Sequence, residues 1–530
     1  LIHTQAYNNS YASVNIFDDI PSSDVSASNS YSAARSYLYV NGVPDIRGAS
    51  GIARPTLNYV SNSSGGDIAF GFQDTDAKLS LLSEPKNAGT NNQYSAVAYI
   101  TSDYNTGWMH GDIKGAFLSD TDTTNVTGSE LITNTDFSSD LSGWTNGNPS
   151  QFTRVTTNVG GDTDGKLMYY AVDNNLRTFT QYVTCVAGER YVLSLRACSD
   201  TASAMVIDID GTNVITIDDN NNAAFIQKQH TFTAGSTSVR IRIESAAANR
   251  SYFTDFSVRL AVEDRSVNNN GLQVFGTITK SAVATGAELV AYSGFSGSNY
   301  LKQPYNSSLS AGTGSQTFMG WVYTDTDSVV RYLFAIGEQD SNEQFRLGFS
   351  NSMIYFDYGT GSQYTSWNVD AIPVNKWTFV VATISAGLRP RIYIDGNLLT
   401  NTPAVNNAAP STFLTATSYI MSIGINQSLN GNNAWNGSLS LIRYSHSVPS
   451  PKQIKKMYED EKMLFQENAK ATLYGSSDAV TALAFDDDTE LLHVGTSSGR
   501  SDFQGLRRIN NTTTAVTTAI TAQNEFIIEQ

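Results

Sequence analysis

The sequence predicts an all-β, multidomain protein in which both chain ends form a propeller-like base, with two inserted β-sandwiches (jelly rolls) and one connecting helix. The chain has 530 residues, more than one ordinary hydrophobic core accommodates, so we expect three or four domains. Only 15% of the residues are charged, and Ser, Thr, Asn and Gly supply most of the polarity. With 27 Tyr and 24 Phe, this composition is typical of short strands joined by many turns.

Residues 1–124 contain five short apolar runs, which we predict to be strands because polar turn residues bound each of them. They lie at residues 12–17, 67–72, 78–82, 95–100 and 112–118. Because the chain begins at Leu1 in mid-pattern, without an initiator Met or a signal peptide, we expect that an N-terminal part is missing.

Residues 471–530 show a similar pattern of short apolar runs separated by polar turns. Apolar runs at 479–485, 490–494 and 503–506 are separated by an acidic turn and a Gly-rich turn, an order that resembles one blade of a β-propeller. One such meander is marginally stable alone, since its sheet faces need cover. We therefore expect it to pack with residues 1–124 into one propeller-like domain.

Residues 129–262 form a distinct unit that opens with Asn134-Thr-Asp136-Phe137 and Gly143-Trp144 and closes with Asp255-Phe-Ser-Val258. These two segments resemble the carbohydrate-binding-module type of β-sandwich that is appended to many glycanases. The resemblance implies a β-sandwich. It does not by itself imply sugar binding, because similar sandwiches also serve as general cell-surface and virion modules.

The two cysteines of the chain, Cys185 and Cys198, lie in this unit. They flank an expected hairpin around residues 187–189, which would place Cys185 beside Arg190 rather than beside Cys198. We therefore predict two buried free thiols and no disulfide stapling.

Residues 263–284 read as a polar linker with one strand at 272–275, and a second sandwich follows at residues 285–447. In Phe318, Gly320 and Val322 every second residue faces one way, which suits a strand with one solvent-facing and one buried face. Asp395-Gly396 between two apolar runs is a signal for a two-residue hairpin.

The order of five segments resembles the laminin-G-like and pentraxin-like jelly rolls of the concanavalin A-like lectin superfamily. The strands of Trp321 and Trp377, the Asp395-Gly396 hairpin and the closing strand at 437–444 carry this resemblance. It implies the jelly-roll fold and leaves function open, because the same fold hosts lectins, enzymes and adhesion modules.

Residues 449–469 contain the expected helix, which begins after Pro449-Ser450-Pro451. Six residues at helical spacing share one face: Ile454, Met457, Tyr458, Glu461, Leu464 and Phe465. We interpret the helix as a strut that packs this face on a neighbouring sheet, with a partner-binding helix as the alternative.

The sequence lacks the usual signs of catalysis, so we predict that the chain is not an enzyme. A glycosidase needs two carboxyl groups facing one cleft, and no strand between residues 294 and 444 has that pattern. We interpret Glu338, Asp340 and Glu343 as a solvated turn, while Asp357 and Asp370 are separated and lack partners. The five His show no metal-ligand spacing. The sequence leaves open whether carboxylates from distant loops come together as a catalytic pair.

Sugar recognition needs exposed aromatic faces with polar groups nearby. Four aromatic residues in Gly-, Ser- and Asn-rich loops are our candidates for carbohydrate binding: Tyr358, Tyr364, Trp367 and Trp435. Trp144, Trp321 and Trp377 lie in strand patterns and are expected in the core, and Trp108 is a weaker loop candidate.

The resemblance of residues 129–262 to carbohydrate-binding modules implies a candidate structural Ca²⁺ site, because such domains often bind the ion between their first and last strands. Asn134, Asp136 and Asp255 occupy roughly those places and offer hard oxygen ligands. The two Asp could equally cap turns. In the jelly roll, Ser440 stands where related sequences often have an acidic residue, which weakens a Ca²⁺ site there.

The formal net charge of −16 argues against nucleic acid or an anionic membrane as the main partner. No apolar run approaches the roughly 20 residues that span a bilayer.

Taken whole, the layout resembles large structural proteins of tailed bacteriophages, chiefly in residues 105–118, 272–304 and 480–506. The resemblance implies a virion tail fibre or spike that is exposed to the medium, adheres to host cell-surface glycans without catalysis, and contacts other tail proteins. A homotrimer is implied by the family alone. The alternatives are a depolymerase tailspike, a purely structural tail hub, nozzle or decoration protein, and a bacterial surface adhesin.

Overall fold

A computed structural model describes the backbone of the residues given next, and the side chains from Ile100 onward. The described residues are 3–7, 11–15, 35–39, 56–62, 65–73, 95–110 and 113–530, without 160–161, 163, 200–204, 218–223, 246–249, 267, 325–328, 338–343, 351–352, 361–362, 371–372, 386, 400–418, 430, 477–479, 487–488 and 524–525. The side chains of 110, 344, 350, 359–370, 432 and 523 are also outside the description.

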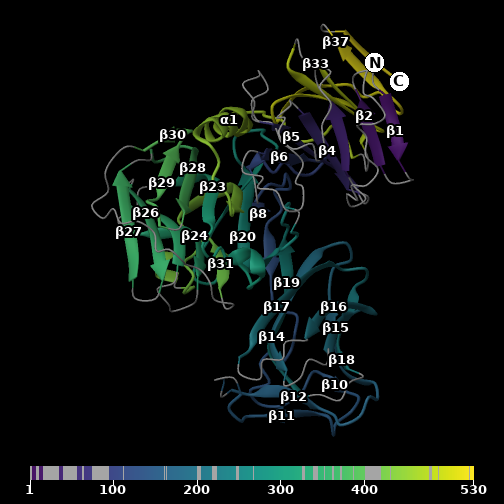
Figure 1. The fold of residues 1–530 in the computed structure, drawn as a ribbon, viewed down its shortest axis with the longest axis vertical. Coiled ribbons are helices and arrows are strands. Elements are labelled where there is room, and N and C mark those ends of the chain that lie inside the picture. The colour runs from purple at the N-terminus through teal and green to yellow at the C-terminus, as the bar shows by residue number, and fades with distance from the viewer. Residues whose placement is uncertain are drawn as a thin grey trace.

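The described chain is all-β apart from one α-helix and short 3₁₀ turns, as the composition predicted. Figure 1 shows one sandwich in blue and teal at the lower end, a jelly roll in green beside the helix, and both chain ends together in purple and yellow. Among the described residues, no helix has the length and apolar character needed to cross a membrane.

The lower sandwich consists of two antiparallel sheets. The first contains, in order, β10 (Thr145–Asn146), β13 (Arg177–Thr184), β18 (Ser238–Ser245), β15 (Met205–Ile209) and β16 (Thr212–Ile217). The second contains β11 (Phe152–Val155), β12 (Lys166–Tyr170), β19 (Arg250–Val262), β14 (Arg190–Ser199) and β17 (Ile226–Thr233). Alternate apolar residues from both sheets form one core, and Trp144 lies in it as predicted.

Cys185 and Cys198 are both free and buried, which confirms the prediction for the thiols. The expected hairpin between them is wrong, because β13 pairs with β18 whereas β14 pairs with β17 and β19. The segment at 187–189 therefore crosses from one sheet of the sandwich to the other.

The jelly roll also has two sheets. We call the first the helix-side sheet; it contains β8 (Ile113–Phe117) and β21 (Val290–Ser293), both against β32 (Gly437–Ser445), then β23 (Ser315–Thr324), β28 (Thr378–Ser385), β29 (Arg391–Ile394) and β30 (Asn397–Leu398). We call the second the far sheet; it contains β20 (Leu272–Ala282), β22 (Tyr300–Gln303), β31 (Ile420–Ile423), β24 (Arg331–Gly337), β25 (Gln344–Ser350), β26 (Met353–Thr360) and β27 (Gln363–Asp370). Two 3₁₀ turns, η2 (Ser307–Leu309) and η3 (Gly431–Asn433), lie in its connections.

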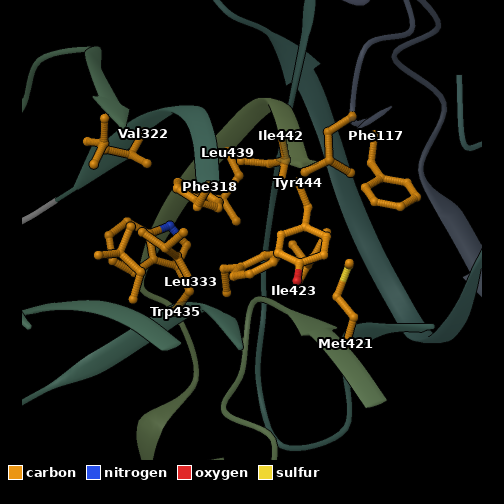
Figure 2. Close-up of a cluster of buried hydrophobic side chains, with 14 of the residues drawn as sticks. Phe117, Phe318, Val322, Leu333, Met421, Ile423, Trp435, Leu439, Ile442 and Tyr444 are labelled. Atoms are coloured by element: carbon orange, nitrogen blue, oxygen red, sulfur yellow. The ribbon is translucent and has the colours of Figure 1, made fainter. Parts of the chain in front are cut away.

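The core of the jelly roll lies between these two sheets. Figure 2 shows Phe318 and Leu439 of the helix-side sheet against Leu333 and Ile423 of the far sheet. Along β23, Phe318 and Val322 lie at alternate positions that face this core, as the period-two pattern predicted.

The helix-side sheet is buried on both faces, so the expectation of one solvent-facing surface is wrong here. On β23, Phe318 and Val322 face the far sheet, while Met319 and Trp321 belong to a second core on the opposite face. The helix and parts of both chain ends cover that second face. Trp321 is core, as predicted, and Trp377 is partly buried beside it.

A β-bulge at Ser440 and Leu441 determines where the end of β32 points. Met319 lies opposite Arg443 and Trp321 lies opposite Ser440, so β32 carries one extra residue against β23. Leu441 adopts a φ of 51°. A bulge reverses the alternation of side chains beyond it, and Arg443 consequently faces the helix rather than the core between the sheets.

Two expected boundaries differ in the structure. The strand expected at 272–275 within the linker is confirmed but is longer: residues 272–282 form β20, which pairs with β19, β21, β22 and β9 (Val126–Gly128), so the expected linker is wrong for residues 276–282. The strand β8, expected in the terminal domain of 1–124, pairs with β32 of the jelly roll. In both cases the partner strand is distant in sequence.

The helix α1 (Pro451–Glu461) begins at a capping box in which Ser450 accepts from the backbone of Gln453, and continues as η4 (Lys462–Phe465). Ile454 and Met457 are fully buried against the helix-side sheet. This contact confirms the prediction that the helix packs one face on a neighbouring sheet. The helical segment ends at Phe465, four residues earlier than expected.

The two chain ends contain the remaining strands. A seven-stranded sheet contains β1 (His3–Tyr7), β2 (Tyr11–Asn15), β3 (Arg35–Tyr39), β4 (Thr56–Asn62), β5 (Gly65–Gln73), β6 (Ser95–Ile100) and β7 (Met109–His110). The C-terminal strands are β33 (Val480–Asp486), β34 (Leu491–Thr496), β35 (Gly499–Gln504), β36 (Arg507–Asn511), β37 (Ile520–Gln523) and β38 (Phe526–Glu529). Asn105 donates from its side chain to the carbonyls of Ala471 and Leu506, which joins the two ends. A propeller-like arrangement of these strands stays a prediction.

Candidate functional site

Two of the predicted sugar-stacking residues are buried. Tyr358 is 1% exposed on β26, and Trp435 is 2% exposed beside Phe349, with 5.5 Å between the ring centroids. Both belong to the jelly-roll core. The loop placement of Tyr358 was wrong, because Ile354, Phe356 and Tyr358 alternate toward the core along one strand.

Tyr364 and Trp367 also lie on a strand rather than in a loop. Both belong to β27, where Trp367 is opposite Phe356 and Tyr364 is opposite Gly359. Their side chains lie outside the description. The weaker candidate Trp108 is 1% exposed and donates from Nε1 to Asp460, so its ring is not available for stacking.

The acidic residues of the jelly roll are also placed. Asp357 accepts hydrogen bonds from Tyr332 Oη and from Arg346 Nε, the latter at 2.7 Å, so the partners that these bonds give it are a phenol and a guanidinium rather than a second carboxyl group. The turn of Glu338, Asp340 and Glu343 lies outside the described residues.

The candidate calcium ligands lie on two segments that do meet. The amide of Phe256 donates to the carbonyl of Thr135 at 2.9 Å, beside Asn134, Asp136 and Asp255. However, Asp136 accepts from the amide of Ser138, and Asp255 pairs with Arg196 at 2.9 Å.

The donor set around these segments fits a cation poorly. Asn134 donates its amide to the carbonyls of Asp140 and Ser142, so it supplies N–H groups there. Across the described residues, no cluster of three or more His, Cys, Asp and Glu side chains could hold a metal ion. This arrangement favours the turn-capping alternative. Ser440 of the jelly roll is buried and donates to the carbonyls of Leu118 and Val290.

In the lower sandwich, the outer face of the sheet that contains β13, β18 and β15 presents an exposed aromatic ring. Tyr182 on β13 is 63% exposed, while its neighbours Phe179 and Val183 are buried in the core. The period of two along the strand therefore places Thr178, Thr180 and Tyr182 together on the outer face.

Charged side chains lie directly beside this ring. In the strand register, Arg240 of β18 is opposite Tyr182, and Arg242 is opposite Thr180. On the other side of β18, Asp208 of β15 is opposite Arg242. Directly opposed residues of antiparallel strands lie close enough for their side chains to touch.

The two arginines are held in place by carboxylates. Asp208, only 1% exposed, lies 2.9 Å from Nη2 of Arg240 and 3.3 Å from Nε of Arg242. Glu244 lies 2.5 Å from Nη2 of Arg242. Because these partners restrain the guanidinium groups, their remaining N–H donors are oriented before a ligand arrives.

We call this set the Tyr182 face: Thr180, Tyr182, Asp208, Arg240, Arg242 and Glu244. A flat ring with adjacent donors and acceptors can bind a pyranose, whose C–H face stacks on the ring while its hydroxyls form hydrogen bonds. The sequence signal was the alternation of Arg with Val or Ile at 239–243. It became informative only with the register of β13, β18 and β15.

A cavity of about 790 Å³ lies between the lower sandwich and the jelly roll. On its wall, Asp120 accepts from Tyr292 Oη and lies 2.8 Å from Nζ of Lys280. Burial raises the pKa of Asp120, against the opposing effect of Lys280. The backbone hydrogen bond from Thr124 lowers the pKa of Asp122 on the same wall.

Residues 295–455 match the family described as the concanavalin A-like lectin/glucanases superfamily. The jelly roll expected at 285–447 therefore has the fold of that superfamily. No curated protein matches the chain.

Several solved structures are similar to parts of the chain. Domain 4 of AbnA, a GH43 extracellular arabinanase from Geobacillus stearothermophilus, in complex with arabinotriose, has a TM-score of 0.29 at 15% identity, covering 37% of this chain and 92% of that one. The CBM22 tandem domain of Xyn10C from Paenibacillus barcinonensis has a TM-score of 0.21 at 11% identity, with coverages of 61% and 98%. The receptor binding domain of botulinum neurotoxin C/D mosaic serotype has a TM-score of 0.29 at 15% identity, and the chain covers 59% of that domain and matches it over 46% of its own length.

Proposed function

We propose that this chain is a non-catalytic structural protein of a tailed-phage virion, a tail fibre or spike, that adheres to host cell-surface glycans. The observation that carries the glycan part is the Tyr182 face, where an exposed ring adjoins two restrained arginines. The match of residues 295–455 to a lectin and glucanase superfamily supports the same ligand class.

The virion assignment rests on the sequence. Cysteine-poor, acidic, turn-rich β-structure suits a component that is assembled in a bacterial cytoplasm and then exposed outside the cell. We propose a homotrimer joined to other tail proteins. Immunogold electron microscopy of phage particles tests the location, and light scattering of the purified chain tests the stoichiometry.

Glycan binding is tested with the whole chain on a host-polysaccharide surface. We expect Y182A to lower the affinity about tenfold, because the stacking surface is lost. The matched control is Y170A, which removes a ring that is 44% exposed on the opposite sheet of the same sandwich. Equal binding by the wild type, Y182A and Y170A would remove the Tyr182 face from the proposal.

A depolymerase is the second candidate, favoured by the cavity between the sandwiches. Asp120 and Asp122 both line this cavity, where Nζ of Lys280 lies 2.8 Å from Asp120 and 3.8 Å from Asp122. Burial raises the pKa of Asp120, as a general acid requires. Release of reducing ends from host polysaccharide, abolished in both D120N and D122N, would replace the non-catalytic proposal with this one.

A further inference from the structure

A second cavity of about 790 Å³ opens at one end of the helix-side sheet. It lies where the start of β23, the end of β28, the start of β29 and the segment after β32 come together. Ser315 and Ser385, opposite each other across β23 and β28, form a hydrogen bond of 2.8 Å between their hydroxyls at its wall. Its volume is within the range of small-ligand sites.

The ionisable groups that line this cavity are all basic or neutral: Arg389, Arg391 and His446. Among the described residues, no carboxylate lines it, although the chain as a whole has a formal net charge of −16. Both arginines are exposed, and neither forms an ion pair within the described part of the chain. Their charge is therefore uncompensated, unlike that of Arg240 and Arg242.

The remaining wall combines apolar and hydroxyl groups. Leu388 is 61% exposed at the rim, and Thr383 and Ser385 contribute hydroxyls. Guanidinium groups bind planar carboxylates and sulfates through paired N–H donors. Hydroxyls and an apolar rim suit the rest of a sugar ring.

We propose that this cavity, the Arg389–Arg391 pocket, binds the anionic group of a carboxylated or sulfated polysaccharide. The inference rests on the proposed glycan adhesion and gives the jelly roll its own ligand class, separate from that of the Tyr182 face. Nucleic acid is disfavoured as the anion by the acidity of the rest of the chain.

The test is calorimetric titration of the whole chain with polygalacturonate oligosaccharides, dextran sulfate and neutral dextran at fixed ionic strength. We expect the wild type to bind at least one polyanion and to ignore dextran. R389A and R391A each lower that affinity about tenfold, and the double variant about a hundredfold. The double Lys variant, R389K/R391K, keeps the charge without the paired donors and has intermediate affinity. Comparing the affinities for polygalacturonate and for dextran sulfate shows whether the pocket prefers carboxylate or sulfate.

The matched control is K376A/K455A, which removes two positive charges from the same jelly roll and helix. Lys376 pairs with Asp395 and Lys455 with Glu459, so their charges are already compensated. An equal loss of polyanion binding in this control would overturn the pocket, as would unchanged binding by R389A/R391A.

The outcomes separate this inference from the proposed function. A wild-type chain that binds host polysaccharide through Tyr182 but neither polyanion would overturn the pocket and leave the proposed function standing. Polyanion binding that needs both arginines, in a chain that does not bind host cells, would support the pocket and overturn the proposed function.

Discussion

Arg443 on β32 and Glu461 at the end of α1 form an ion pair in which both side chains are fully buried. The second contact of the pair, from Nη2 to Oε2, measures 2.9 Å. Trp108 donates its amide to Glu461 and accepts from Arg443 through its carbonyl, while Trp321 donates from Nε1 to Glu461. One carboxylate thus joins the N-terminal part of the chain, the jelly roll and the helix.

Removing Glu461 should therefore destabilise the jelly roll strongly. In E461A, Arg443 stays buried without its counter-charge, and we expect the free energy of unfolding to fall by about 3–5 kcal/mol. Urea unfolding followed by tryptophan fluorescence measures this, since Trp108 and Trp321 both contact the pair. The control E459A removes a carboxylate that is 40% exposed on the same helix and should change stability by at most about 1 kcal/mol. Similar losses in both variants would contradict a special role for the pair.

Gly107 is required by the same ion pair. A Cβ at this position would lie 2.6 Å from Nη1 of Arg443 and 2.8 Å from Oε1 of Glu461, and the φ of Gly107 is +67°. We expect G107A to destabilise by about 1–3 kcal/mol through overpacking, beyond its backbone strain. Gly312 has a φ of +58° with open space around it, so G312A isolates the strain alone. Equal melting temperatures of the two variants would refute the steric part.

The native thiols should be unreactive. Burial raises the pKa of Cys185 to about 11, and Cys198 is fully buried. At pH 8 only about one Cys185 thiol in a thousand is the reactive thiolate. We expect no labelling by a thiol-disulfide reagent in the folded protein and labelling of both cysteines in denaturant. Rapid labelling of the folded protein would contradict this burial.

Asp264 should make stability depend on pH. Its carboxyl accepts from the amides of Ala116, Ser266 and Asn270, and burial raises its pKa from 3.8 to about 6 in spite of these bonds. Between pH of about 4 and 6, the folded chain retains a proton that the unfolded chain has released. The contribution of this group to the free energy of unfolding therefore decreases as pH rises through that window.

The variant D264N cannot titrate, so the wild type should lose stability relative to it between pH of about 4 and 6. Melting temperatures of both proteins across this range measure the difference. A constant difference at every pH would show that Asp264 has an ordinary pKa.

Chelation tests the calcium prediction. Because Asp255 pairs with Arg196 and Asp136 caps its own turn, we expect EDTA to leave the melting temperature of the lower sandwich unchanged. A drop of several degrees that added Ca²⁺ reverses would establish a structural ion there.

The parts of the fold that depend on local sequence were predictable. Ser450 and Pro451 mark the start of the helix, and the spacing of Ile454 and Met457 identifies its buried face. The alternation around Phe318 likewise predicts a jelly-roll strand. Each of these signals lies within a few residues of the element that it predicts.

The parts that depend on distant partners were not predictable. The turn-like composition around Tyr358 and Trp367 indicates loops, yet both residues lie in strands whose ladder partners supply the missing stability. The Tyr182 face required the order of three strands, because Arg240 and Asp208 are 32 positions apart in the chain. Alternation along one strand cannot specify its neighbours.

The strand β20 has a mechanical consequence. It is hydrogen-bonded at one end to β19 of the lower sandwich and along its length to β22, β21 and β9. Because β20 runs from its pairing with β19 directly into the strands of the jelly roll, a displacement of the lower sandwich is transmitted to the jelly-roll sheet through paired backbone rather than through a slack tether.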